Sequence, residues 1–166
     1  MSSICGNINF SLTRLRSPEL HAKKLIKDHK HESQRSFLVS ALDFALKNSG
    51  FSCEYTNSFF CSASISDDII ANAVILERIE NINAWNVYYF VVDYDKRRHA
   101  LGSKTLGFIK SIARSRGIHQ IDACVLNDNH AALKFWSKNG FTVRYKQVVV
   151  EFEGVVHLGS LLRYDC

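Results

Sequence analysis

The sequence has little proline and glycine, one proline and eight glycines among 166 residues, and it lacks any long apolar run. Scarce proline and glycine leave little room for a flexible linker, and no internal repeat or low-complexity tract is present. A membrane-spanning helix needs about 20 consecutive apolar residues. These absences predict a single domain over residues 1–166 that does not cross or enter a membrane.

The chain also lacks the residue order of a secretory signal peptide, because Arg14 and Arg16 precede any apolar stretch. Its five cysteines are odd in number and widely scattered, at positions 5, 53, 61, 124 and 166. Such spacing fits neither a disulfide framework nor a set of metal ligands. We therefore expect a cytoplasmic protein with no metal site.

Positive charge is in excess, with a net charge of +5 and a pI near 9.0. The basic residues are dispersed, and no run is long enough to resemble a nucleic-acid-binding tail. The charge therefore fits two explanations, an acidic partner such as RNA or a pocket for a polyanionic ligand. No RNA-recognition motif supports the first explanation.

The hydrophobic periodicity predicts alternating elements of an α/β (α+β) protein. Predicted strands span about 7–12, 59–65, 69–76, 85–92, 118–126, 141–152 and 155–164, and predicted helices span about 17–28, 32–48, 102–116 and 129–139. The order is strand, two helices, antiparallel strands, then alternating strands and helices and a final hairpin. This order predicts a mixed sheet with helices on both faces.

A basic turn, Arg97-Arg98-His99-Ala100-Leu101-Gly102-Ser103, follows an apolar strand and opens a helix. The backbone amides from about 98 to 103 would point into one turn at the helix N-terminus, which favours an anion. Arg97, Arg98 and Lys104 add formal positive charge. Taken alone, the turn is explained equally well by an anion site and by a basic strand-helix connection that only exposes its charges to water.

A second segment runs from Asn129 to Phe141 and has the pattern of a capped helix. Asn129 would cap its N-terminus, and Gly140 would follow its C-terminus. Ala132 and Trp136 share one face of this helix, one turn apart. A capped amphipathic helix explains the segment without any ligand.

The two segments, and the distance between them along the chain, together resemble the acyl-CoA-binding half of the GNAT N-acetyltransferase superfamily. The family pattern Arg/Gln-x-x-Gly-x-Gly/Ala aligns with residues 97–102, and Ala100 replaces its first glycine. The family pattern Asn-x-x-Ala-x-x-Phe-Tyr-x-x-x-Gly-Phe aligns with residues 129–141, and Trp136 replaces its tyrosine. The resemblance implies a GNAT-type mixed, mostly antiparallel sheet with splayed central strands. Alanine is the smallest alternative to glycine and is tolerable at position 100 if its φ stays negative.

The resemblance implies an acetyl-CoA-dependent N-acetyltransferase, in which a primary amine attacks the thioester directly within a ternary complex. The residues that it implies in acetyl-CoA binding are Phe90, Val91, Val92, Arg97, Arg98, His99, Ala100, Leu101, Gly102, Ser103, Asn129 and Trp136. Gly102→Glu should then abolish thermal stabilisation by acetyl-CoA. The acceptor is not identified by any residue; a small metabolite, an antibiotic, a protein amino group and aminoacyl-tRNA all stay open.

The resemblance leaves the general acid open. In many family members the tyrosine that Trp136 replaces is the proposed general acid that protonates the departing thiolate. An indole N–H can donate a hydrogen bond but cannot release its proton at useful pH. Tyr88, Tyr89 and Ser137 are substitutes along the chain. A thiol with a pKa near about 8.5 also leaves without full protonation.

The general base is equally open, because Asn83-Ala84-Trp85-Asn86 contains no glutamate at the place where some family members have one. Glu77 and Asp93 are the nearest carboxylates along the chain. Glu77 also fits a solvated strand end, and Asp93 also fits a residue that shapes the turn. A relay through water needs neither carboxylate.

Two other functions compete with the transferase. A non-catalytic acyl-CoA-binding or regulatory module would keep the fold and tolerate Ala100, Trp136 and the missing glutamate. A basic RNA-binding protein would show affinity that falls steeply with salt. The edge strands could also support a homodimer.

Overall fold

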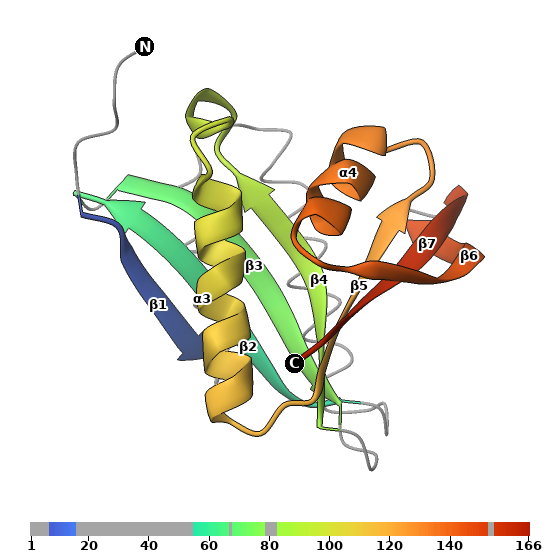
Figure 1. The fold of residues 1–166 in the computed structure, drawn as a ribbon, viewed down its shortest axis with the longest axis horizontal. Coiled ribbons are helices and arrows are strands. Elements are labelled where there is room, and N and C mark those ends of the chain that lie inside the picture. The colour runs from blue at the N-terminus through green and yellow to red at the C-terminus, as the bar shows by residue number, and fades with distance from the viewer. Residues whose placement is uncertain (1–6, 16–54, 67, 79–82, 153–154) are drawn as a thin grey trace.

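The computed structural model describes residues 7–15, 55–66, 68–78, 83–152 and 155–166 (Figure 1). In chain order they form β1 (Asn9–Arg14), β2 (Tyr55–Ile65), β3 (Asp68–Arg78), β4 (Ala84–Val92), the 3-10 turn η1 (Tyr94–Lys96), α3 (Leu101–Ser115), β5 (Gln120–Leu126), α4 (His130–Lys138), β6 (Thr142–Phe152) and β7 (Val155–Asp165). The helices predicted over 17–28 and 32–48 lie outside the described residues.

The strands form one sheet in the order β1-β2-β3-β4-β5-β7-β6. Only β4 and β5 pair in parallel, and the other neighbours are antiparallel. Figure 1 shows α3 in front of the β2–β4 part of the sheet and α4 in front of the region where β4 and β5 lie. The mixed, mostly antiparallel sheet predicted from the sequence is confirmed.

The core lies between α3 and the sheet. Leu106, Ile109 and Ala113 recur at helical spacing on one face of α3 and are fully buried. They pack in one cluster with Trp85 and Ile121 of the two parallel strands. Burying each large apolar side chain contributes about 1.5–3 kcal/mol, so this face holds α3 across the sheet.

The two parallel strands separate halfway along their length. Their pairing runs from Ala84 opposite Gln120 to Val87 opposite Ala123 and ends there. Beyond this point β4 continues along β3, and β5 continues along β7. The expected splay of the central strands is therefore present in the register.

A β-bulge lies in β4 where the splay begins. On β3, Val74 is opposite Tyr89 but the next residue, Ile75, is opposite Val87, so β4 has one extra residue at Tyr88. A bulge bends the strand that contains it and increases its local twist. The bulge thus accounts for the direction in which β4 leaves β5.

Candidate functional site

The turn between β4 and α3 has an unusual backbone. Arg98 and Ala100 have φ angles of 67° and 57°, in the left-handed region. The condition under which alanine would be tolerated without strain, a negative φ, is therefore not met at Ala100. The chain reverses within a few residues from strand to helix, and Ala100 is the N-cap of α3. A left-handed alanine costs about 1–2 kcal/mol, which explains why glycine suits this position.

The amides of this turn donate to no acceptor among the residues that the structure describes. The Arg97 amide donates to the Tyr94 carbonyl at 3.2 Å, and the Lys104 amide donates to the Ala100 carbonyl at 3.0 Å. Between them, the amides of residues 98–103 donate to no other residue in the described ranges, and α3 has no side-chain cap. A helix N-terminus with free amides and a positive dipole end is a suitable site for an anion.

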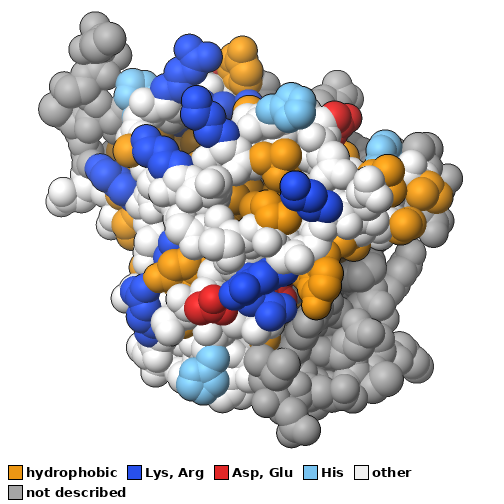
Figure 2. All heavy atoms as spheres, turned by 45° about the vertical axis from the view of Figure 1, so that its right-hand side comes forward, with side chains coloured by type: hydrophobic (Ala, Val, Ile, Leu, Met, Phe, Trp, Pro, Cys, Tyr) orange, Lys and Arg blue, Asp and Glu red, His pale blue; other side chains and the backbone are white. Residues whose placement is uncertain are grey.

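Formal positive charge surrounds these amides. Arg97, Arg98 and Lys104 are all exposed, and so is the neighbouring His99. Figure 2 shows several Lys and Arg side chains close together in its upper left part. Arg97 is held in place, because its Nε donates to the Val92 carbonyl at 3.1 Å and its guanidinium lies 5.1 Å from the ring centroid of Tyr94.

Gly102 has a packing role that the sequence did not reveal. A Cβ at this position would lie 3.0 Å from Cε2 of Phe135 and 3.2 Å from Cγ2 of Val92. Glycine therefore lets α3, α4 and β4 meet closely, and the two sequence motifs touch each other here. The Gly102→Glu test mixes a packing defect with any effect on a ligand, so another position is needed for that test.

The second motif forms the predicted capped helix. The Oδ1 atom of Asn129 accepts a hydrogen bond from the Ala132 amide at 3.0 Å, which confirms the cap. Asn139 is the C-cap residue of the helix and is followed by Gly140, whose φ of 83° is the left-handed conformation typical after a helix. Phe141 then leads into β6 and is buried.

Trp136 is 5% exposed and lies among other rings. The centroids of Phe141, Phe135 and Phe90 lie 4.7, 5.5 and 5.6 Å from its own. Phe90 and Phe135 are also stacked, with centroids 5.5 Å apart. We call Phe90, Phe135, Trp136 and Phe141 the aromatic cluster. Because Phe90 comes after the bulge, the cluster joins α4 to the part of β4 that has left β5.

Tyr89 lies on the other face of the sheet from the aromatic cluster. It is opposite Val74, whereas Phe90 is opposite Ala73, a member of the core beneath α3. Burial raises the pKa of Tyr89 to about 12, and the charge of Arg97 opposes part of this rise. A hydroxyl with such a pKa is a weak acid near neutral pH.

The two candidate carboxylates lie at opposite ends of β4. Glu77 is opposite Trp85 at the start of β4, where it accepts hydrogen bonds from Nδ2 of Asn57 and, at 3.2 Å, from Nε1 of Trp85. Asp93 follows the last residue of β4, and its amide donates to the Ile70 carbonyl at 2.9 Å. From Trp85 to Val92 the strand extends over roughly 23 Å, so the structure does not bring these carboxylates together.

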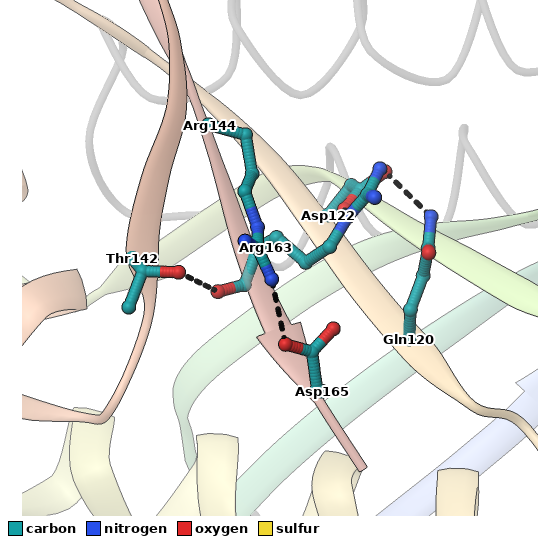
Figure 3. Close-up of polar contacts among 6 residues, drawn as sticks. All are labelled: Gln120, Asp122, Thr142, Arg144, Arg163 and Asp165. Carbon is teal, nitrogen blue, oxygen red and sulfur yellow. Dashed lines mark hydrogen bonds and ion pairs between the residues drawn. The ribbon is translucent and has the colours of Figure 1, made fainter.

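Sequence reasoning missed a buried ion pair beside the splay (Figure 3). Asp122 is 1% exposed and accepts from Nε and Nη2 of Arg163 at 2.8 and 3.0 Å. Nε2 of Gln120 adds a third hydrogen bond at 3.1 Å. The hydrogen bonds to Asp122 raise the pKa of Arg163. This pair joins β5 to β7 one residue before the last pairing of β5 with β4. In the sequence, the acidic Asp122 within an otherwise apolar strand was the signal that could have indicated a buried ion pair.

The described residues contain no group of His, Cys, Asp and Glu side chains that could hold a metal ion. No helix in the described part of the chain is long and apolar enough to cross a membrane.

The site thus contains two parallel strands that separate beside the N-terminus of α3, whose first amides have no acceptor among the described residues. A match of the sequence to a known family agrees with this arrangement. Residues 45–148, more than half of the chain, match the family described as the acetyltransferase (GNAT) domain. The chain belongs to the GNAT acetyltransferase family. Comparison with the curated proteins found no match.

Solved structures of this family share the fold at low sequence identity. A GNAT family acetyltransferase from Elizabethkingia anophelis with acetyl-CoA bound is 13% identical, with a TM-score of 0.64 over 96% of this chain and 99% of that chain. A Bacillus subtilis acetyltransferase in complex with CoA is 14% identical, with a TM-score of 0.64 over 96% and 99%. The ribosomal-protein-S18-alanine N-acetyltransferase from Escherichia coli is 16% identical, with a TM-score of 0.63 over 95% and 94%.

Proposed function

We propose that this protein transfers an acetyl group from acetyl-CoA to a primary amine by direct attack within a ternary complex. The observation that carries the proposal is the row of amides at residues 98–103 that have no acceptor among the described residues, beside strands that separate. The diphosphate of acetyl-CoA would accept hydrogen bonds from these amides. Arg98 and Lys104 are exposed around them and would add favourable charge.

The pantetheine arm would lie along β4 beyond the bulge. There β4 no longer pairs with β5, so the backbone of Phe90, Val91 and Val92 can bind an extended ligand as a strand would. An N–H on this strand would polarise the thioester carbonyl and stabilise the negative charge that develops on its oxygen. These roles use the chain's own main-chain groups and require no metal.

The proton on the attacking amine needs another route. A typical ammonium has a pKa above about 10 and must lose its proton before the nitrogen can attack. Glu77 is already engaged by two donors at one end of β4, and Asp93 lies at the other end. Since no described carboxylate pair converges on the splay, we propose that the proton leaves through water.

Ser103→Glu tests the diphosphate site without disturbing the packing at Gly102. Ser103 is in the first turn of α3, where a carboxylate interacts favourably with the helix dipole but repels a diphosphate. We expect an unchanged or slightly higher melting temperature and at least about tenfold weaker acetyl-CoA binding, since one strong electrostatic contact is worth about 1.4 kcal/mol or more. Isothermal titration calorimetry and thermal shift measure the two effects.

Ser111→Glu is the matched control, because Ser111 is exposed on the same helix and far from its N-terminus. It should leave acetyl-CoA binding within about twofold of the wild type, since the dipole effect is confined to the first turn. Equal binding by the Ser103→Glu variant and the wild type would place the diphosphate elsewhere.

A non-catalytic acyl-CoA-binding module is the second candidate, favoured by the separation of Glu77 and Asp93. Thiol release from acetyl-CoA, measured across a panel of small amines, peptides and aminoacyl-tRNA, distinguishes the two. Release that depends on one acceptor supports the transferase. Tight binding of acetyl-CoA without release for any acceptor supports the module.

A further inference from the structure

The positive charge of the chain is concentrated in two segments, residues 96–121 and 129–150. Together they contain 11 of the 21 Lys and Arg residues and none of the 16 Asp and Glu residues. The rest of the chain has the other 10 basic residues and all 16 acidic ones, which gives it a net charge of −6. The overall net charge of +5 therefore hides a strong separation of charge along the chain.

The fold brings the two basic segments together on one side of the sheet. They contain α3 and α4, and Figure 1 shows both helices in front of the sheet. The N-terminal part of α3 meets α4, since a Cβ at Gly102 would lie 3.0 Å from a carbon of Phe135. Farther along α3, the ammonium group of Lys110 donates to the carbonyl of Asn139, the C-cap of α4. Two basic helices without a carboxylate thus lie side by side.

Four side chains of these helices form a surface that we call the basic face: Lys104 and Arg114 of α3, and Lys134 and Lys138 of α4. All four residues are exposed. Lys134 and Lys138 are one turn apart, on the side of α4 that faces away from the buried Trp136. Figure 2 shows Lys and Arg side chains spread widely over the surface in view, whereas Asp and Glu side chains are few.

The charges of the basic face are not neutralised by the described part of the chain. None of its four residues forms an ion pair with a described residue, and the ion pairs there use Arg144 and Arg163 instead. The guanidinium group of Arg114 donates to the hydroxyl of Tyr164, which is neutral and leaves the positive charge in place. The basic face is therefore available to an anionic partner.

The chemistry of the basic face favours a phosphate backbone over an acidic protein. The exposed large apolar side chains of the described residues lie in β4, η1, β6 and β7, and none of them lies in α3 or α4. A protein interface has apolar or aromatic anchors at its centre. Contacts with nucleic-acid phosphates need only positive charge, whereas binding of single strands also uses exposed aromatic rings that stack on bases. A nucleic-acid duplex therefore fits this surface best.

We propose that the basic face binds the phosphate backbone of a nucleic-acid duplex without sequence selection. Lys134 and Lys138 are about 6 Å apart along α4, and phosphates recur about every 3.4 Å along one strand of a duplex. One strand can therefore contact both lysines. Lys104 and Arg114 extend the contact over about 15 Å of α3. The surface goes beyond the proposed diphosphate site, in which Lys134 and Lys138 have no part.

Fluorescence anisotropy with labelled RNA and DNA duplexes of about 20 base pairs tests the proposal. Four phosphate contacts predict that log affinity falls with log salt with a slope of about −3 to −4, since each contact contributes about 0.9. The Kd expected for such sequence-independent contacts is about 10⁻⁶ to 10⁻⁴ M near physiological salt. The two duplexes share the same backbone chemistry, and binding to either with this slope supports the proposal.

Lys138→Glu replaces an attractive contact by a repulsive one. It should weaken duplex binding about five- to tenfold at low salt and make the salt slope shallower by about 1. Arg14→Glu is the matched control, because it makes the same change in net charge at an exposed position of β1. In the sheet, β1 is three strands from β4, about 14 Å, which exceeds the Debye length of about 8 Å. The control should weaken binding less than about twofold.

Two outcomes of the variants and the wild type would overturn the proposal. Equal losses in Lys138→Glu and Arg14→Glu would show that net charge, and not the basic face, drives binding. Wild-type protein that binds neither duplex would have no such surface. Both substitutions are at exposed positions, so stability should change by less than about 0.5 kcal/mol, and thermal unfolding checks that each variant is folded.

Two other probes distinguish the remaining partners. Poly-glutamate of similar length that binds as tightly as the duplexes would overturn the choice of nucleic acid in favour of an acidic protein. Single strands that bind more tightly than duplexes of the same length would overturn the choice of a duplex. Loss of acetyl-CoA binding is a separate result, because none of these measurements requires acetyl-CoA. The proposed function and the basic face can therefore fail independently.

Discussion

The turn before α3 and the helix α4 carry the two motifs of the family, yet they use their backbone groups in opposite ways. In the turn, the amides of residues 98–103 make no hydrogen bond to other described residues, and two non-glycine residues have positive φ. In α4, Asn129 caps the N-terminus, Gly140 follows the C-terminus, and Trp136 is packed among rings. Free donors and strain are concentrated where a ligand is proposed to bind, while the satisfied helix supports that site.

The largest effect on stability should come from removing the central side chain of the aromatic cluster, in the region of α4. Trp136→Ala removes a large buried side chain, so the free energy of unfolding should fall by about 3–5 kcal/mol. Urea denaturation followed by circular dichroism measures this loss. Ser137→Ala, next to it on the exposed side of α4, should change stability by less than about 0.5 kcal/mol. Similar losses in both variants would show that the cluster does not hold α4.

An intermediate effect should come from the contact between the two regions. Gly102→Ala places a Cβ 3.0 Å from a carbon of Phe135, and we expect a loss of about 1–3 kcal/mol in unfolding free energy. Gly107→Ala on the same helix is the control, because its Cβ would meet nothing within 4 Å. There the better helix propensity of alanine should stabilise the protein by about 0.5–1 kcal/mol. Stabilisation by both substitutions would contradict the close approach at Gly102.

The smallest effect should come from relieving strain in the turn. Ala100→Gly should raise the free energy of unfolding by about 0.5–1 kcal/mol, since glycine adopts the φ of 57° without a Cβ clash. Ala131→Gly, in the first turn of α4, should instead lower it by about 0.5–1 kcal/mol. Equal destabilisation by both changes, seen in thermal unfolding, would mean that Ala100 is not strained.

Local sequence patterns predicted most of the described elements. The helix expected from Gly102 to Arg116 is Leu101–Ser115, and the one expected from Asn129 to Asn139 is His130–Lys138. Each is set by apolar spacing within a few turns and by capping residues at its own ends. Leu101, the first residue of α3, is 3% exposed and belongs to the buried face of this helix.

The placement of the candidate site residues required the tertiary structure. The alanine at position 100 does not itself signal a positive φ, because alanine, unlike the glycine of the family pattern, ordinarily has a negative φ, and the turn is imposed by the elements on both sides. Glu77 and Asp93 are plausible partners along the chain, but the antiparallel register of β3 and β4 places them far apart. Asp122 and Arg163 meet across 41 positions of sequence.

The sequence by itself determined the helices and strands of the described residues, their order and the two family motifs, because these depend on interactions among residues a few positions apart. Only the tertiary structure decided that Gly102 faces Phe135, that β4 bulges at Tyr88 and that Trp136 lies in an aromatic cluster beside the splay. Such contacts join segments distant along the chain. They form only when the buried faces of several elements pack together, and no local pattern encodes that arrangement.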